Sequence, residues 1–105
     1  EVGNKPVIGC TGCTACRKLG KCVHNDLVNE VSKEIESADG FIVGSPVHYA
    51  AASGAATSFL DRLFYSTDKN QLRHKFGASI VSCRRGGASA TFDQLNKYFT
   101  INECL

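Results

Sequence analysis

Four cysteines near the start of the chain are the residues whose type and spacing are best suited to chemistry. Cys10, Cys13, Cys16 and Cys22 follow the pattern Cys-x2-Cys-x2-Cys-x5-Cys. Four thiolates this close in sequence can surround one metal centre without help from the rest of the fold. They suit a 4Fe–4S cluster, although zinc also accepts four thiolates, usually from two separated Cys-x2-Cys pairs. Free thiols, or a disulfide formed on oxidation, are the alternative without a metal.

A second candidate site follows a short apolar stretch in the middle of the chain. Residues 41–43 predict a buried parallel strand, and open α/β sheets bind ligands beyond the carboxyl ends of such strands. The residues expected there are Ser45, Pro46, Val47, His48 and Tyr49. Because Pro46 has no N–H for a sheet ladder, the strand is predicted to end by Ser45. His48 and Tyr49 suit packing against a flat ligand, but taken alone they are better explained as a cover over the sheet end.

A third candidate site follows the next predicted strand, just before a helix. It consists of Cys83, Arg84, Arg85, Gly86 and Gly87. Arginines and glycines ahead of a helix N-terminus suit an anion or a carbonyl oxygen, while a solvated turn explains the arginines equally well. A phosphatase site of the form Cys-x5-Arg is excluded, because the residue six positions after Cys83 is Ser89.

The elements expected to hold these sites alternate between helix and strand. Asn25 or Asp26 can cap a first helix, and Gly40 is predicted to supply the left-handed residue that ends it. Apolar residues at 56, 59, 60, 63 and 64 have helical spacing, residues 78–82 resemble a second strand, and residues 88–99 predict another helix. This alternation predicts one α/β domain over residues 1–105 with a parallel sheet, and a cysteine-rich loop at residues 9–22.

The composition and net charge indicate which kinds of binding partner and which cellular setting to expect. The chain has 105 residues with a net charge of +2 and a pI near 8.3, which is too mild to indicate nucleic-acid or membrane binding. No apolar run approaches the roughly 20 residues of a membrane span. The six cysteines are concentrated in one segment rather than spread as in a secreted disulfide framework, so a reducing, cytoplasmic setting is expected.

Together these segments resemble the flavodoxin-like NAD(P)H-dependent FMN reductase family. Residues 44–49, 53–54 and 59–62 are similar to the middle of that family, and residues 82–87 and 90–96 resemble its next flavin-contacting segment. The cysteine run resembles the compact cluster motif of the family's iron–sulfur flavoprotein branch. The resemblance covers nearly the whole chain, from residue 5 to residue 101.

The resemblance implies a role for each site. Residues 45–49 would border the FMN isoalloxazine ring largely through backbone groups, with His48 or Tyr49 near its face or edge. Residues 83–87 would approach the pyrimidine side through backbone amides, and Arg84 or Arg85 would add positive charge that stabilises reduced flavin. The four clustered cysteines would hold a cluster that relays electrons to or from the flavin. No side chain needs to act as acid, base or nucleophile.

The implied function is that of an FMN-dependent redox protein. It would be either an NAD(P)H-dependent reductase of flavin or quinone-type acceptors or an iron–sulfur flavoprotein electron carrier. Its partners would be a small-molecule or protein redox partner and a second copy of itself, because proteins resembling this one pair across their flavin sites. The alternative is a non-enzymatic fragment with a structural zinc or thiol site and no flavin.

The chain departs from the family pattern at both ends. Family members begin with a strand and a loop that wraps the FMN phosphate, and nothing similar precedes Glu1; a further strand and helix would be expected after Leu105. The sequence therefore predicts an incomplete flavodoxin-like, doubly wound sheet that lacks its first strand and its last strand and helix. We expect a trimmed or partial chain, or a partner chain that supplies the strand, and weakened FMN binding.

Overall fold

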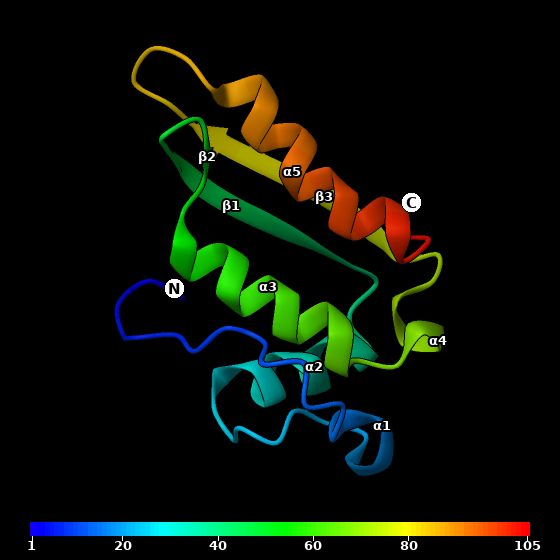
Figure 1. Cartoon of the computed structure of the whole chain (residues 1–105). Helices are drawn as coiled ribbons and strands as arrows, with labels where there is room; N and C mark the ends of the chain where they lie inside the picture. The colour runs from blue at the N-terminus through cyan, green and yellow to red at the C-terminus, as the bar shows by residue number, and fades with distance from the viewer.

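Helices and strands alternate through most of the chain, as the sequence predicts. The computed structural model describes residues 1–105, and Figure 1 shows the elements in order along the chain. They are α1 (Cys16–Leu19), α2 (Leu27–Ser37), β1 (Gly40–His48), β2 (Ala51–Ala52), α3 (Gly54–Ser66), α4 (Lys69–Leu72), β3 (Phe76–Ser82) and α5 (Ala88–Ile101). The short elements α1, β2 and α4 were not predicted, because two to four residues are too few to show a periodicity.

The sheet has the strand order β2-β1-β3 and is mixed rather than purely parallel. β1 and β3 run parallel, with residues paired from Gly40 opposite Phe76 to Pro46 opposite Ser82. β2 pairs antiparallel with the end of β1 through a tight hairpin. The predicted parallel pair is confirmed, and the added antiparallel strand is compatible with a flavodoxin-like α/β fold.

The helices cover one face of the two long strands. Phe41 of β1 points to this face, where its ring centroid lies 5.7 Å from that of Phe64 in α3 and 5.3 Å from that of Phe99 in α5. On the other face Ile42 is 68% exposed, and Phe76 and Ile80 of β3 are similarly uncovered. Helices on both faces, which the doubly wound prediction requires, are therefore not found within these residues.

Side-chain caps fix where the helices adjoining the candidate sites begin. Asp26 caps α2 by accepting a hydrogen bond from the Val28 amide, and Ser53 caps α3 by accepting one from the Ala56 amide. The predicted cap at Asp26 is confirmed. These caps place the cysteine loop before α2 and the polar end of β1 before α3.

Two local predictions were wrong. α2 ends at Ser37, and Gly40 is instead the first residue of β1, where an added Cβ would lie 2.6 Å from the Phe76 carbonyl oxygen. Gly40 is thus needed for close strand approach and not for a left-handed helix end. β1 also continues past Pro46 to His48. Pro46 is paired with β3 but not with β2, since the pairing with β2 begins at Val47, so its missing N–H leaves no hydrogen bond to β2 unmade.

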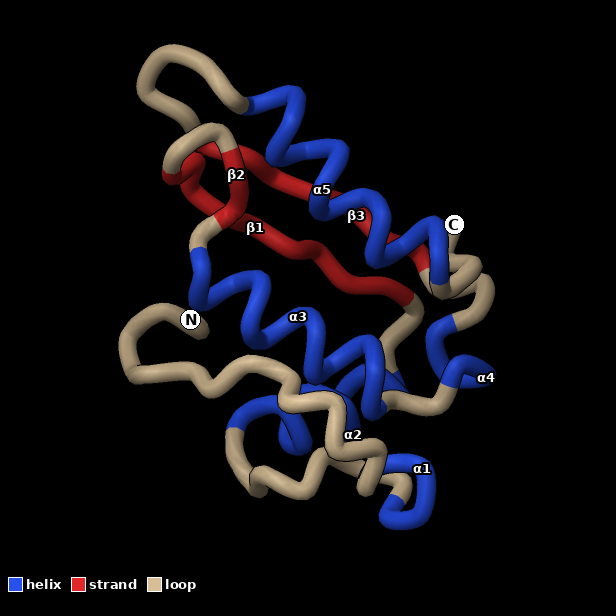
Figure 2. The backbone as a smooth tube through the Cα atoms, in the orientation of Figure 1, coloured by secondary structure: helices blue, strands red, loops and turns tan.

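A groove runs along the edge of β1 that β3 does not pair. It has a volume of about 660 Å³ and is walled by apolar residues of α2, β1 and α3. Figure 2 shows α3 passing beside β1 at this edge, while β2 pairs only with its last residues. None of the helices is long and apolar enough to cross a membrane.

Candidate functional site

The four clustered cysteines line one small cavity. Its volume is about 20 Å³, and its wall includes Tyr65 and Ser66 near the end of α3. All four thiols are free; Cys10 and Cys13 are exposed, whereas Cys16 and Cys22 are half-buried. Residues 9–22 contain one regular element, the single turn α1. The fold therefore brings together the residues that the sequence pattern groups.

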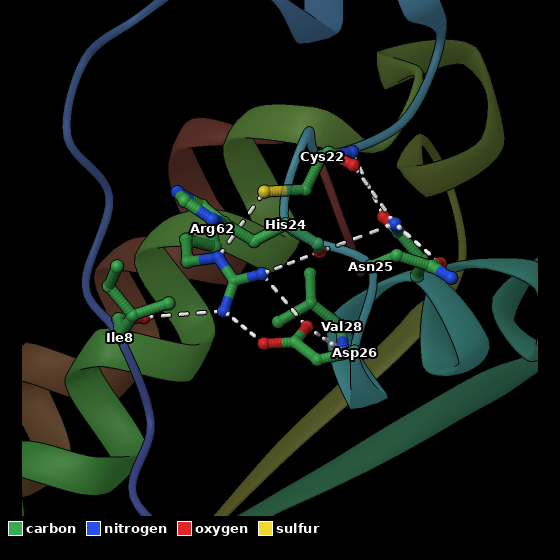
Figure 3. Close-up of polar contacts among 8 residues, drawn as sticks. Ile8, Cys22, His24, Asn25, Asp26, Val28 and Arg62 are labelled. Atoms are coloured by element: carbon green, nitrogen blue, oxygen red, sulfur yellow. Dashed lines mark hydrogen bonds and ion pairs between the residues drawn. The ribbon is translucent and has the colours of Figure 1, made fainter.

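Arg62 of α3 is a buried side chain that contacts Cys22, the last cysteine of this loop. It is 2% exposed, and its guanidinium forms a two-point ion pair with Asp26 at 2.7 and 2.8 Å. The same group donates to the backbone carbonyls of Ile8 and His24 and, through Nε, to the Cys22 sulfur at 3.3 Å. Figure 3 shows Arg62 at the centre of these contacts, with the Cys22 sulfur pointing toward it. One buried cation thus joins the segments on both sides of the cysteine loop.

The charges of this ion pair stabilise each other. The hydrogen bond from Arg62 holds the pKa of Asp26 below its usual value, although partial burial opposes the shift. The same hydrogen bond raises the pKa of Arg62, so the guanidinium stays charged at any physiological pH. Because a buried charge is costly unless paired, Asp26 is what allows Arg62 to lie beneath the loop.

Asn29 of α2 fixes the backbone of Cys22. Its side-chain oxygen accepts from the Cys22 amide at 2.9 Å, and its amide nitrogen donates to the Cys22 carbonyl at 2.9 Å. Asn29 is buried, so these hydrogen bonds are shielded from water. Cys22 is therefore held by its backbone and by its sulfur before any metal binds.

The donor set fits a metal group bound by thiolates. Four free thiols converge on one cavity, and the Ser66 hydroxyl on its wall is buried without a hydrogen-bond partner. No three cysteine, histidine or acidic side chains are arranged to hold a single ion. Cluster thiolates each bind a different iron and so stand farther apart than the ligands of one zinc ion. The residue types therefore suit a thiolate-bound group, but the cavity has room for only about one water molecule and not for a cluster.

The other two predicted sites meet at the opposite end of α3. Residues 45–49 form the end of β1 and the start of a two-residue turn, in which Tyr49 and Ala50 have φ values of 52° and 60°. These angles fit a type I′ hairpin turn, which glycine and asparagine usually occupy. The strained turn places Tyr49 entirely in solvent beside the exposed His48.

Residues 83–87 pack against this hairpin through Gly87. A Cβ at Gly87 would lie 2.7 Å from the Ala50 Cα and 2.9 Å from Val47 Cγ1, and Gly87 has a φ of 85°. Cys83, Arg84, Arg85 and Gly86 are exposed, and neither arginine forms an ion pair. We call residues 45–49 and 83–87 the rim. The rim therefore brings together two of the predicted sites and two arginines that form no ion pair.

Ser45 supports the rim from inside. Its buried hydroxyl accepts from the Ser53 amide at 2.9 Å and donates to the Pro46 carbonyl at 2.8 Å. The Gln94 side chain of α5 accepts from the Ala52 amide at 2.9 Å and holds the other side of the hairpin. Because the Ser45 hydroxyl is already paired, a contact from Ser45 to a ligand would come from its backbone.

The cysteine loop and the rim are separated by the length of α3. Ser45 is bonded to the N-cap of this helix, whereas the Cys16 thiol lies against the Tyr65 carbonyl near its end. Thirteen helical residues at about 1.5 Å each span roughly 18 to 20 Å. Figure 1 shows α1 and the loop before α5 at opposite ends of the molecule. The two sites are therefore not in contact within one chain.

Arg62 and Asn29 are site residues that the sequence reasoning missed. Arg62 lies three positions after Phe59 and next to Leu63, within the apolar stripe of α3. A charged residue in such a stripe is a signal that a buried partner exists. Nothing in the sequence around Asn29 indicates which backbone groups its amide would bond.

Comparison with known proteins identifies related chains. The family model for NADPH-dependent FMN reductase matches residues 1–105. An iron-sulfur flavoprotein of Methanocaldococcus jannaschii is 33% identical over 107 residues, covering 100% of this chain and 55% of the relative. An iron-sulfur flavoprotein of Methanosarcina thermophila is 31% identical over 104 residues, which cover 96% of this chain and 54% of the relative. One of Clostridioides difficile is 41% identical over 54 residues, which cover 50% of this chain and 24% of the relative. The chain thus spans about half the length of the first two relatives.

Proposed function

The chain belongs to the family of NADPH-dependent FMN reductases, and from this premise we propose that it carries the iron–sulfur site of an FMN-dependent redox protein. Cys10, Cys13, Cys16 and Cys22 hold a 4Fe–4S cluster in this proposal. The two relatives are named iron-sulfur flavoproteins, which supports the pairing of the two cofactors. A bound cluster would supply one-electron transfer, and a bound flavin would supply hydride chemistry.

The observation that carries the proposal is the convergence of the four thiols on one cavity. Cys22 is fixed by Asn29 and Arg62, while Cys10 and Cys13 are exposed at the mouth. A ligand held by the fold on one side and exposed thiols on the other suit a site that is loaded after folding. Cys10, Cys13 and Cys16 would supply the remaining three thiolates.

The rim supplies the flavin part of the proposal. Its residues would contact the ring through backbone groups at 45–49 and 83–87, with Arg84 and Arg85 beside the ring oxygens. Since these arginines have no partner in the chain, their charge is available to an anionic ligand. Donors and cations at this edge stabilise the reduced ring.

The partners of the protein follow from the separation of the two sites. Because α3 lies between the cysteine loop and the rim, the cluster needs an electron partner outside its own rim. A second copy of the chain or another redox protein can fill this role. We assign NAD(P)H as the electron donor on the family description and leave the acceptor as a small molecule or protein.

Anaerobic reconstitution of the chain with iron, sulfide and FMN, followed by visible spectroscopy, tests this function. We expect broad absorption from the cluster that bleaches on reduction, and a flavin signal that weakens in the double variant R84Q/R85Q. The control is S82A, an exposed change that leaves the arginines in place. Zinc bound without iron, together with no flavin signal, would favour the non-enzymatic alternative.

A further inference from the structure

The guanidinium of Arg62 uses every N–H that it has. Two donate to the Asp26 carboxylate, one each to the carbonyls of Ile8 and His24, and the Nε–H to the Cys22 sulfur. We propose that Arg62 is a positioning residue that orients Cys22 and raises the reduction potential of the metal group bound there. This inference rests on the proposed function, because it concerns the group that the cysteines hold.

The direction of the Nε–H bond is fixed by the other contacts of Arg62. The two-point pair with Asp26 and the two carbonyls determine the plane of the guanidinium, and a planar group has no further freedom to turn Nε elsewhere. Asn29 fixes the acceptor by holding the Cys22 backbone at both its N–H and C=O. Donor and acceptor are therefore aligned by the fold itself.

Such a bond affects the two redox states unequally. Reduction adds negative charge to the cluster and its thiolate sulfurs, and a donor to sulfur stabilises the more negative state more strongly. Arg62 and Asp26 form a neutral pair, so the hydrogen bond rather than a net charge distinguishes the states. Because Arg62 is buried in the intact chain, its hydrogen bond to the Cys22 sulfur is shielded from water.

Two variants separate this role from simple support of the loop. R62K keeps a positive charge, but a single ammonium cannot hold Asp26 in two places and also reach Cys22 in the same geometry. D26N keeps a cap acceptor for α2 and the Arg62 side chain, but it removes the negative charge that pairs with the buried guanidinium. Both variants should destabilise the chain. If Arg62 only supported the loop, the reduction potential would therefore shift in the same direction in both variants.

Spectroelectrochemical titration of the iron-loaded chains measures the potential. We expect R62K to shift it to more negative values than wild type, and D26N to leave it unchanged or shift it to more positive values. An unchanged potential in R62K at full iron content would overturn the inference. A negative shift of equal size in both variants would also overturn it.

A second measurement needs neither metal nor the R62K variant. In the metal-free chain, the Arg62 Nε–H proton is protected by burial and can be observed by nuclear magnetic resonance. We expect C22A to move this resonance and C104A, a change at a distant cysteine, to leave it in place. A resonance that C22A does not move would disprove the contact. Absence of iron from wild type would instead count against the proposed function.

Discussion

The two ends of α3 hold their candidate sites by different means. At the C-terminal half, a buried arginine, a carboxylate and an asparagine fix the last cysteine of the motif through side chains. At the N-terminus, the rim is held by a strained turn, the close approach of Gly87 and hydrogen bonds of the neutral Ser45 and Gln94 side chains, without a buried charge. The difference indicates that Cys22 is fixed in place within this chain, whereas the rim presents exposed groups.

The comparison is tested most strongly by removing the cation. R62M should lower the free energy of unfolding by about 3 kcal/mol, because breaking a buried pair leaves several acceptors without a donor. The carboxylate side chain is 41% exposed and can be partly solvated, which keeps the loss below the upper end of the usual range. Urea unfolding followed by circular dichroism measures this effect.

The matched control for that prediction is R85M in the rim. Arg85 is exposed and forms no ion pair, so its loss should change the stability by less than about 0.5 kcal/mol. Equal losses in R62M and R85M would remove the distinction between the two ends of the helix.

The rim should be most sensitive at Gly87. G87A introduces a Cβ at 2.7 Å from the Ala50 Cα at a positive φ, so we expect a loss of about 2 kcal/mol. G86A is the control, since nothing lies within 4 Å of a Cβ there. Thermal unfolding of the two variants measures the difference, and a G87A chain as stable as G86A would show that the two rim segments do not pack together.

Ser45 offers a smaller test of the same end. S45A removes the acceptor for the Ser53 amide and should cost about 1 kcal/mol of stability. S82A, at an exposed position of the neighbouring strand, should cost much less. The urea concentration at which half of the chains are unfolded is compared between S45A and S82A. An S45A chain with the midpoint of S82A would mean that the buried hydroxyl contributes nothing to the hairpin.

Acid should weaken the cysteine end first. The pKa of Asp26 is lowered in the folded chain, chiefly by the hydrogen bond from Arg62, relative to a usual value of 3.8. Its stabilising contribution is therefore complete above the unfolded pKa and is lost as the pH falls through the lower folded pKa. Because the carboxylate is partly exposed, we expect less than about 1 kcal/mol. Stability measured from pH 6 to pH 2 should fall less in D26N than in wild type. Parallel curves would contradict this assignment.

The sequence was sufficient for the features that depend on local patterns. The apolar spacing of α3, the cap at Asp26 and the apolar run at the start of β1 are each determined by neighbours in the chain. The predictions for these three elements were confirmed because local physics is enough to produce them. The spacing of the four cysteines also keeps them near one another, and all four line one cavity, while a metal bound there stays a prediction.

Other features depend on contacts between distant segments. The contact of Arg62 with Ile8 joins residues 54 positions apart, and no local pattern specifies it. The turn at Tyr49 and Ala50 lacks the glycine that usually marks a hairpin, so β2 was not expected. The prediction that Pro46 ends the strand failed because it requires knowing which edge of β1 is paired. The roles assigned to rim residues in flavin binding stay predictions.

Iron and acid-labile sulfide analysis of the anaerobically reconstituted chain tests whether the four clustered cysteines hold an iron–sulfur cluster. We expect about four irons and four sulfides per wild-type chain, the composition of a 4Fe–4S cluster. It predicts a clear loss in C22A and no loss in C104A, whose half-buried thiol lies outside the cysteine loop. Zinc in place of iron, or equal iron in wild type and C22A, would contradict the account.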